Sequence, residues 1–163
     1  GKAPNKSGNN HPILAPYGIF KTSDGEIAVA PASDKFCSIF LECIDLTNLL
    51  ENELYKNNSN RMKNRDSLNE IVNKRMISET SDFWIKKLNK AGCPAAKIVS
   101  LPEALNSQLI QDNEMVINSN GPEGRQIKMT GFPVKLSDTP SKLYRSPPLL
   151  GEHTKEILKT IKK

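Results

Sequence analysis

The sequence predicts an α+β fold, in which a small antiparallel sheet is flanked by helices and is followed by an extended, proline-rich arm and a C-terminal helix. Three observations carry this prediction. Two short β-prone runs, residues 17–22 and 26–30, are joined by a Ser-Asp-Gly turn. Apolar residues then recur at helical spacing between positions 34 and 91. Four prolines between positions 133 and 148 prevent a helix there.

The hairpin at residues 17–30 is the best-defined strand pair, because Gly25 can take the positive φ that a tight hairpin needs. Pro31 ends its second strand. Ser33 or Asp34 can then cap a helix whose apolar residues face the sheet.

Between positions 45 and 78 the sequence predicts a brief helix and a loop, followed by a longer helix. Residues 45–60 are rich in asparagine and contain only a short leucine cluster. The helical period returns over residues 61–78. Its apolar stripe consists of Leu68, Ile71, Val72 and Met76.

The next helix is predicted over residues 83–91, with Ser81 or Asp82 as its cap and Gly92 at its end. Its inward-facing residues are Trp84, Leu88 and Ala91. Because Trp84 lies on this apolar face, it is interpreted as a core residue and not as a ligand platform.

After residue 92 the predicted elements are shorter. They are a strand at 97–99, helices at 101–105 and 108–112, a hairpin formed by 115–117 and 126–129, and a final helix at 152–163. The final helix has an apolar edge of only three residues, Ile157, Leu158 and Ile161. It therefore needs a partner surface, in this chain or in another.

Composition argues against several classes of function. The net charge of +5 comes from basic residues that alternate with acidic ones on helix faces, without stacking aromatics, so nucleic-acid binding is not expected. No apolar run is long enough to cross a membrane, and no signal peptide is visible. The three cysteines form no C-x-x-C pair, which favours free thiols in a reducing cytoplasm.

The common catalytic and metal-binding patterns are missing from the sequence. The only histidines, His11 and His153, have no cysteine or paired carboxylates at metal-ligand spacing, so no metal site is expected. No Walker loop or dinucleotide fingerprint occurs. Cys93 has no base near it in the sequence and is interpreted as packed, not nucleophilic.

The candidate site is the polar loop before the first strand, which consists of Gly8, Asn9, Asn10, His11 and Pro12. A polar loop that leads into a rigid hairpin suits contact with a ligand. His11 is either a surface histidine or a hydrogen-bond donor that faces a ligand, and exposed amides at Gly8 and Asn9 could hold an oxyanion. No residue of the chain is assigned a catalytic role.

Five short motifs stand in order along the chain. They are Gly8-Asn9-x-His11-Pro12-x-x-Ala15-Pro16-Tyr17-Gly18-x-Phe20, Asn64-Arg65-Asp66-x-Leu68, Trp84-x-x-x-Leu88-x-x-Ala91-Gly92-x-Pro94, Gly131-Phe132-Pro133-Val134-Lys135-Leu136-Ser137 and Pro147-Pro148-Leu149-Leu150-Gly151-Glu152-His153-Thr154. In this order they resemble the family III CoA-transferases, the group of formyl-CoA transferase, carnitine CoA-transferase and the α-methylacyl-CoA racemases. The resemblance covers nearly the whole chain.

The resemblance implies that the chain is the carboxy-terminal part of such an enzyme. Residues 1–12 would be a linker and active-site lid loop, and residues 13–106 the small α+β domain. Residues 107–163 would form the return linker and a C-terminal helix that packs on a missing large, Rossmann-like domain. That domain would carry the nucleophilic aspartate and most CoA contacts, so the isolated chain is expected to be inactive. Family members are homodimers of interlocked chains.

The chemistry that the resemblance implies is transfer of CoA between carboxylic acids through an aspartyl-CoA intermediate. The substrates would be an acyl-CoA thioester and a free carboxylic acid, with no tightly bound cofactor. Some members carry consecutive glycines in the lid loop, where this chain has Gly8 alone. The alternatives are part of an α-methylacyl-CoA racemase, or a non-catalytic binding or assembly module.

Overall fold

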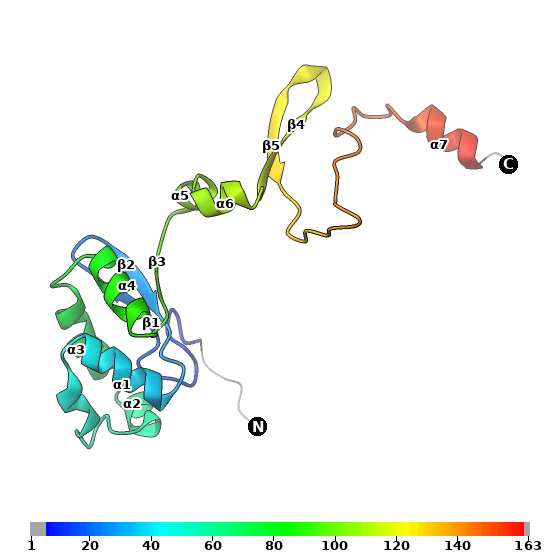
Figure 1. The fold of residues 1–163 in the computed structure, drawn as a ribbon. Helices are drawn as coiled ribbons and strands as arrows, with labels where there is room; N and C mark the ends of the chain where they lie inside the picture. The colour runs from blue at the N-terminus through cyan, green and yellow to red at the C-terminus, as the bar shows by residue number, and fades with distance from the viewer. Residues whose placement is uncertain (1–5, 162–163) are drawn as a thin grey trace. The chain divides into compact units, whose positions relative to one another are not determined.

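The computed structural model describes residues 6–161 and divides the chain into two compact units (Figure 1). The first unit ends at Ile98 and the second begins at Val99. Each unit combines helices with a small antiparallel sheet, which confirms the predicted α+β fold. The candidate loop belongs to the first unit.

The sheet of the first unit has three antiparallel strands in the order β1-β2-β3. β1 (Gly18–Lys21) and β2 (Glu26–Val29) form the predicted hairpin. β3 (Ala95–Lys97) pairs with β2 and lies two residues earlier than predicted. The Asn89 side chain fixes this earlier start, because it bonds both the N–H (2.9 Å) and the carbonyl (3.0 Å) of Ala95.

The turn between β1 and β2 depends on Asp24 and not on a glycine in the left-handed region. Gly25 does not have the positive φ that was predicted for it, although the turn closes with a 2.9 Å bond from the Thr22 N–H to the Gly25 carbonyl. Asp24 Oδ1 instead accepts from the Thr22 hydroxyl at 3.0 Å. It also accepts from the N–H (2.7 Å) and the hydroxyl (2.8 Å) of Ser81, the first residue of α4 (Ser81–Lys90). These bonds tie the hairpin to α4.

The Asp24 bonds predict a stabilisation that depends on pH. The backbone and hydroxyl of Ser81, with a smaller effect of Thr22, hold the pKa of Asp24 below its ordinary value. Such a carboxylate stabilises the fold above an ordinary pKa of about 4, and this stabilisation is lost as the pH falls through the folded pKa. We expect Asp24→Asn to lower the melting temperature at about pH 6, and the difference from wild type to narrow towards about pH 3. Thermal unfolding by circular dichroism checks this, and a difference that widens in acid would contradict it.

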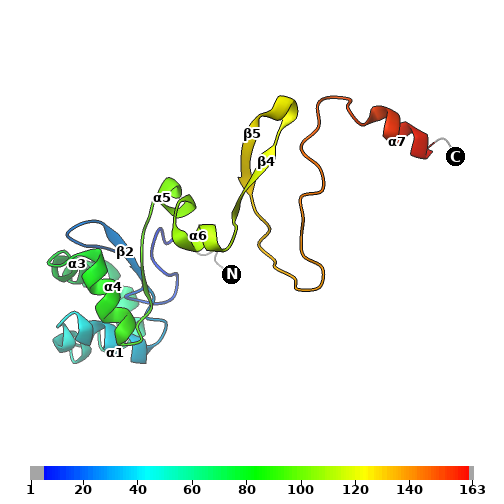
Figure 2. The same cartoon turned by 45° about the horizontal axis from the view of Figure 1, so that its top comes forward.

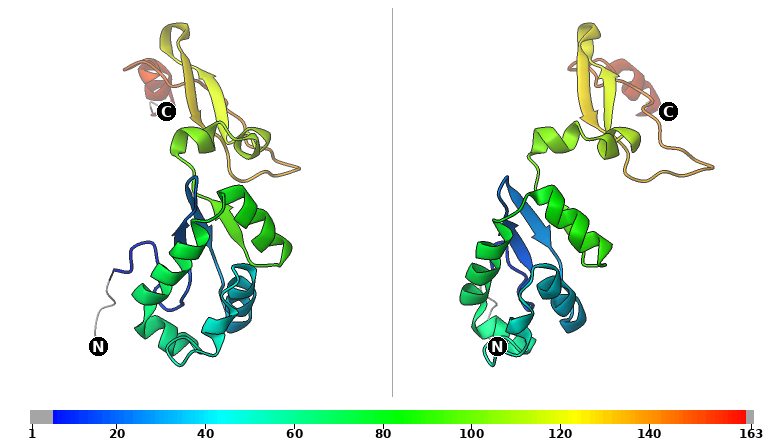
Figure 3. Two further views of the ribbon diagram at one scale, coloured as in Figure 1. Left: turned by 90° about the vertical axis from the view of Figure 1, so that its left-hand side faces the viewer. Right: turned by 60° about the vertical axis from the view of Figure 1, so that its left-hand side comes forward.

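Helices surround the strands of the first unit (Figure 3). The bounds are α1 (Asp34–Cys43), the 3-10 turn η1 (Thr47–Leu50), α2 (Asn58–Lys63), α3 (Arg65–Met76) and α4 (Ser81–Lys90). α3 packs against β1, and α4 packs against β2 and β3. The predicted cap of α1 is confirmed, because the Ser33 hydroxyl accepts from the Phe36 N–H at 3.3 Å.

The single helix predicted over residues 61–78 is wrong, because the chain turns at Asn64 and forms two helices, α2 and α3. Asn64 has φ −110° and ψ 28°, and its side-chain Nδ2 donates to the carbonyls of Leu54 (3.2 Å) and Asn60 (3.0 Å). No glycine or proline marks this break in the sequence. The predicted apolar stripe lies on α3, where Leu68, Val72 and Met76 are buried.

The predicted cap of α4 is also wrong, since Thr80 takes this place and not Ser81 or Asp82. The Thr80 hydroxyl accepts from the Phe83 N–H at 3.3 Å. Ser81 is fully buried and donates its hydroxyl to Asp24, so it belongs to the first turn of the helix.

The core of the first unit contains Trp84, which is fully buried and donates its Nε1–H to the Met76 carbonyl at 2.7 Å. This confirms its interpretation as a core residue. Leu88 is buried as predicted, whereas Ala91 is exposed because the helix ends at the preceding residue. Other fully buried large side chains include Phe20, Ile27, Val29, Phe40, Leu41, Ile44, Leu68, Val72 and Met76.

The second unit consists of short elements and a long arm (Figure 2). The elements are α5 (Leu101–Leu105), α6 (Gln108–Asp112), β4 (Val116–Asn120), the 3-10 turn η2 (Pro122–Gly124), β5 (Gln126–Thr130) and α7 (Thr154–Ile161). β4 and β5 form the second predicted hairpin. Residues 131–153 contain no helix or strand, as the prolines predict.

The final helix, α7, begins two residues later than predicted, and residues 162–163 of the predicted helix lie outside the described residues. None of the α7 side chains that the structure describes is buried. Its apolar edge is well exposed, with Ile157 at 55%, Leu158 at 48% and Ile161 at 70%. No helix among residues 6–161 has the length and apolar character needed to cross a bilayer.

Candidate functional site

The candidate loop lies directly before β1 and contains a turn. The Asn10 N–H donates to the Ser7 carbonyl at 3.1 Å, and Gly8 within this turn has φ +57°. Glycine adopts such a φ without a steric cost, which explains its place here. Gly8, Asn9 and Pro12 are exposed, so the turn presents its outer side to solvent.

Backbone contacts hold the loop against the start of β1. The His11 N–H donates to the Tyr17 carbonyl at 2.9 Å. A Cβ atom on Gly18 would lie 2.8 Å from the Asn9 carbonyl oxygen and 3.0 Å from Asn10 Oδ1. The loop therefore covers Gly18 closely, and this position has no space for a side chain.

Two side chains of α3 hold the loop from another side. Arg65 Nη2 donates to the His11 carbonyl at 2.8 Å, and Asn69 Nδ2 donates to Asn10 Oδ1 at 3.0 Å. The two residues are four positions apart, which places them on one face of the helix. Within the part of the chain that the structure describes, Arg65 Nε and Asn69 Oδ1 are buried without a hydrogen-bond partner.

The His11 imidazole is fixed by stacking and by a hydrogen bond. It stacks on the Tyr17 ring with 4.6 Å between centroids and 25° between planes. Its Nδ1 accepts from the Ile13 N–H at 3.3 Å. A neutral imidazole whose Nδ1 accepts carries its proton on Nε2, so Nε2–H remains as a donor. The ring is half-buried, and its role as a donor to a ligand stays a prediction.

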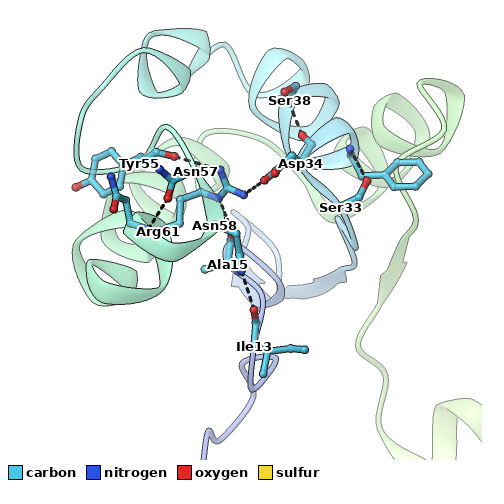
Figure 4. Close-up of polar contacts among 11 residues, drawn as sticks. Ile13, Ala15, Ser33, Asp34, Ser38, Tyr55, Asn57, Asn58 and Arg61 are labelled. Atoms are coloured by element: carbon cyan, nitrogen blue, oxygen red, sulfur yellow. Dashed lines mark hydrogen bonds and ion pairs between the residues drawn. The ribbon is translucent and has the colours of Figure 1, made fainter.

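The chain between the loop and β1 is anchored by Arg61 of α2 (Figure 4). Arg61 is 3% exposed, and its Nε donates to the Ala15 carbonyl at 2.6 Å. Its Nη1 donates to the Tyr55 carbonyl at 3.2 Å, and its Nη2 pairs with Asp34 of α1. Figure 4 shows this guanidinium between groups from three separate segments.

Asn58, also on α2, adds a second anchor to the same segment (Figure 4). Its Nδ2 donates to the Ile13 carbonyl at 2.9 Å, and its Oδ1 accepts from the Ala15 N–H at 3.2 Å. The Ala15–Pro16 peptide bond is cis. The support for the loop therefore comes from α2 as well as α3.

The described part of the first unit contains no group of metal-ligand side chains and no activated thiol near this loop. Among residues 6–161, no group of three or more His, Cys, Asp or Glu side chains could hold a metal ion. Burial, with the neighbouring thiols of Cys43 and Cys37, raises the pKa of Cys93 to about 11. A thiol with this pKa is protonated and unreactive at neutral pH, which confirms Cys93 as a packing residue.

Sequence reasoning identified the loop but not the side chains that hold it. The sequence marked Arg65 only as a member of the motif at residues 64–68, and Asn58 lies in a segment predicted as a loop. The available signal was the helical period, which places Arg65 and Asn69 one turn apart. Arg65 also lines an open pocket of about 440 Å³ formed by residues 62–67 at the turn between α2 and α3.

Comparison with known proteins places the chain among enzymes of one family. Human succinyl-CoA:glutarate CoA-transferase is 30% identical over 154 residues, which is 94% of this chain and 35% of that enzyme. Acetyl-CoA:oxalate CoA-transferase of Acetobacter aceti is 29% identical over 137 residues, 84% of this chain and 34% of that enzyme. The chain thus spans about a third of the length of these two relatives.

Solved structures and the family pattern agree with this comparison. A CaiB/BaiF family protein from Brucella suis is 28% identical and superimposes with a TM-score of 0.74, over 98% of this chain and 41% of that protein. The sequence pattern of CoA-transferase family III matches residues 1–154. The chain therefore belongs to CoA-transferase family III.

Proposed function

We propose that the protein carrying this chain moves CoA from an acyl-CoA thioester to a free carboxylic acid. The observation that carries this proposal is the family pattern over residues 1–154. The relatives in human and Acetobacter are named for transfer between two carboxylic acids, succinate and glutarate in one and acetate and oxalate in the other. CoA enters this reaction as part of a substrate, with no tightly bound cofactor.

The proposed reaction uses a carboxylate nucleophile on an aspartate outside this chain. The aspartate attacks the thioester carbonyl, forming a mixed anhydride and releasing CoA thiolate. The thiolate attacks the aspartyl carbonyl, which gives the aspartyl-CoA thioester and frees the donor acid. The acceptor carboxylate then attacks this thioester, and the thiolate released attacks the acceptor carbonyl of the new anhydride. The product acyl-CoA leaves and the aspartate is restored.

The role proposed for this chain is to supply a lid over that intermediate. Residues 1–12 would form the linker and lid loop, and Gly8, Asn9, Asn10, His11 and Pro12 would face the substrates. The Nε2–H of His11 could donate to a carboxylate or thioester oxygen, because its Nδ1 is already occupied by the Ile13 N–H. No catalytic residue is assigned within the chain.

The rest of the chain is proposed to connect this lid with a large domain. Residues 13–106 would be the small domain, and residues 107–163 the return linker and the helix that packs on the large domain. The exposed apolar edge of α7 supports this, since it is the kind of surface that packing covers. The complete enzyme is proposed to be a homodimer. The three cysteines of this chain are free thiols, which favours a cytoplasmic location.

An exchange assay tests the proposed function. The chain joined to its large domain is incubated with an acyl-CoA and a series of free acids, and new acyl-CoA species are measured by mass spectrometry. We expect exchange by the complete enzyme and none by residues 1–163 alone. Exchange by the isolated chain would show that the nucleophile lies within it and would overturn this division of roles.

Two other functions have distinct outcomes. An α-methylacyl-CoA racemase would incorporate solvent deuterium at Cα of its substrate without exchanging CoA. A non-catalytic binding or assembly module would use the arm and α7 for docking, which the exposed edge of α7 also permits. Deletion of residues 138–163 identifies such a module, because a module that docks through these residues would lose both self-association and ligand binding.

A further inference from the structure

We propose that Arg65 is a positioning residue that orients the His11 donor in the lid loop, with Asn69 holding the adjacent Asn10. The proposal rests on the proposed function for its effect on activity. Its structural part concerns only how α3 holds the loop, so it can be tested separately.

Bonds to both backbone groups of His11 add to the ring stacking and the Ile13 bond that orient its side chain. Its N–H donates to the Tyr17 carbonyl at 2.9 Å, and its carbonyl accepts from Arg65 Nη2 at 2.8 Å. The first bond comes from the chain that leads into β1, and the second from a helix 54 positions away in sequence. Without the Arg65 bond, the peptide that follows His11 is held less tightly, which weakens the bond from the Ile13 N–H to Nδ1. The direction of Nε2–H therefore depends on Arg65.

A guanidinium is suited to this contact. The bond from Arg65 to a neutral carbonyl carries a full charge on its donor, which makes it stronger than a bond between two neutral groups. The same Nη2 lies 2.7 Å from the sulfur of Met62 in α2, so the side chain is also held across the turn between α2 and α3. Lysine carries the same charge and can donate to the same carbonyl from its single ammonium nitrogen.

Two buried polar atoms without hydrogen-bond partners indicate that α3 holds the loop but does not fix it in a single position. Arg65 Nε and Asn69 Oδ1 are buried and have no partner among the described residues, although both side chains bond the loop. Buried polar atoms without partners are uncommon and are destabilising. A small displacement of the loop could give them partners. This is what a positioning contact on a loop that closes over substrate requires.

Three variants test the proposal. Arg65→Gln removes the charged donor, Arg65→Lys keeps a charge that can reach a carbonyl, and Lys74→Gln makes the same charge change at an exposed site of α3. In the complete enzyme we expect Arg65→Gln to lower kcat for CoA transfer about 10- to 100-fold, as loss of a hydrogen bond from a charged group does. KM for acyl-CoA should change by less than about threefold. Arg65→Lys should recover most of the loss, and Lys74→Gln should have wild-type kcat.

A second measurement on the 163-residue chain does not depend on activity. By NMR, Arg65→Gln should raise the hydrogen-exchange rate of the Ile13 amide about tenfold and weaken the cross-peaks between the His11 and Tyr17 rings. The amides of β2 and α4 should keep their rates, which excludes general unfolding. Unchanged exchange of the Ile13 amide and unchanged ring contacts would overturn the proposal. If the complete enzyme transfers no CoA, the proposed function fails, and the NMR result alone decides the role of Arg65.

Discussion

Replacing Arg61 with methionine is expected to lower the free energy of unfolding of the first unit by about 2–5 kcal/mol. Methionine fills much of the same volume but donates no hydrogen bond. The carbonyls of Ala15 and Tyr55, both in residues 4% exposed, would lose their charged donor in the interior. A buried carbonyl left without a donor costs roughly 1–3 kcal/mol.

The ion pair with Asp34 contributes little to this expectation. The Asp34 side chain is 73% exposed, so its carboxylate is solvated by water when Arg61 is absent. Ion pairs between exposed partners are worth on the order of 1 kcal/mol or less, and the solvated carboxylate brings this pair closer to that case than to a fully buried pair. The predicted loss therefore comes from the two carbonyls, and Asp34→Asn should be much milder than Arg61→Met.

Urea unfolding measures this difference. The fluorescence of Trp84, the single tryptophan, reports on the core of the first unit. Lys63→Met is the matched control, because Lys63 is an exposed cation in the same short helix. The free energy of unfolding of Lys63→Met should stay within about 0.5 kcal/mol of the wild-type value. An Arg61→Met protein as stable as the control would mean that these bonds do not stabilise the native unit.

The sequence predicts those parts of the fold that depend on residues close together in the chain. Alternating apolar residues place Phe20, Ile27 and Val29 in the core, and the hairpin follows from that pattern. The Ser33 cap was predictable because a cap bonds an N–H only three positions away. The Asn64 break was not, since its side chain bonds a carbonyl ten positions back in a region without periodicity.

The candidate site was even less predictable from the sequence, because its contacts join residues that are far apart in the chain. The loop was found because its composition is polar and because a motif marks it. Its supports are Arg61 and Arg65, whose partners lie 46 and 54 positions away in sequence. An arginine on a helix usually indicates a solvated face, and nothing local separates these two from Arg75. These long-range contacts could therefore be identified only from the structure.

Gly18→Ala should reduce CoA transfer by the complete enzyme about 100-fold, with only a modest fall in melting temperature from the disturbed loop contacts. The added Cβ would lie 2.8 Å from the Asn9 carbonyl oxygen, so the loop must move outward. The φ of Gly18 is not in the left-handed region, so alanine fits the strand itself without backbone strain. A displacement of about 1 Å at a substrate-facing group can cost about 100-fold in rate.

The same hairpin provides the control for Gly18→Ala. A Cβ on Gly25 would lie 3.6 Å from the Ser81 hydroxyl, an ordinary contact, and Gly25 has no positive φ. Gly25→Ala should therefore keep wild-type kcat/KM, although both variants add one methyl group to a glycine of the same hairpin. If Gly18→Ala also keeps wild-type kcat/KM, the position of the loop over β1 has no part in the reaction. If both variants lose activity equally, the loss comes from the hairpin and not from the loop. Only a loss confined to Gly18→Ala supports a lid whose working position is set by its contact with Gly18.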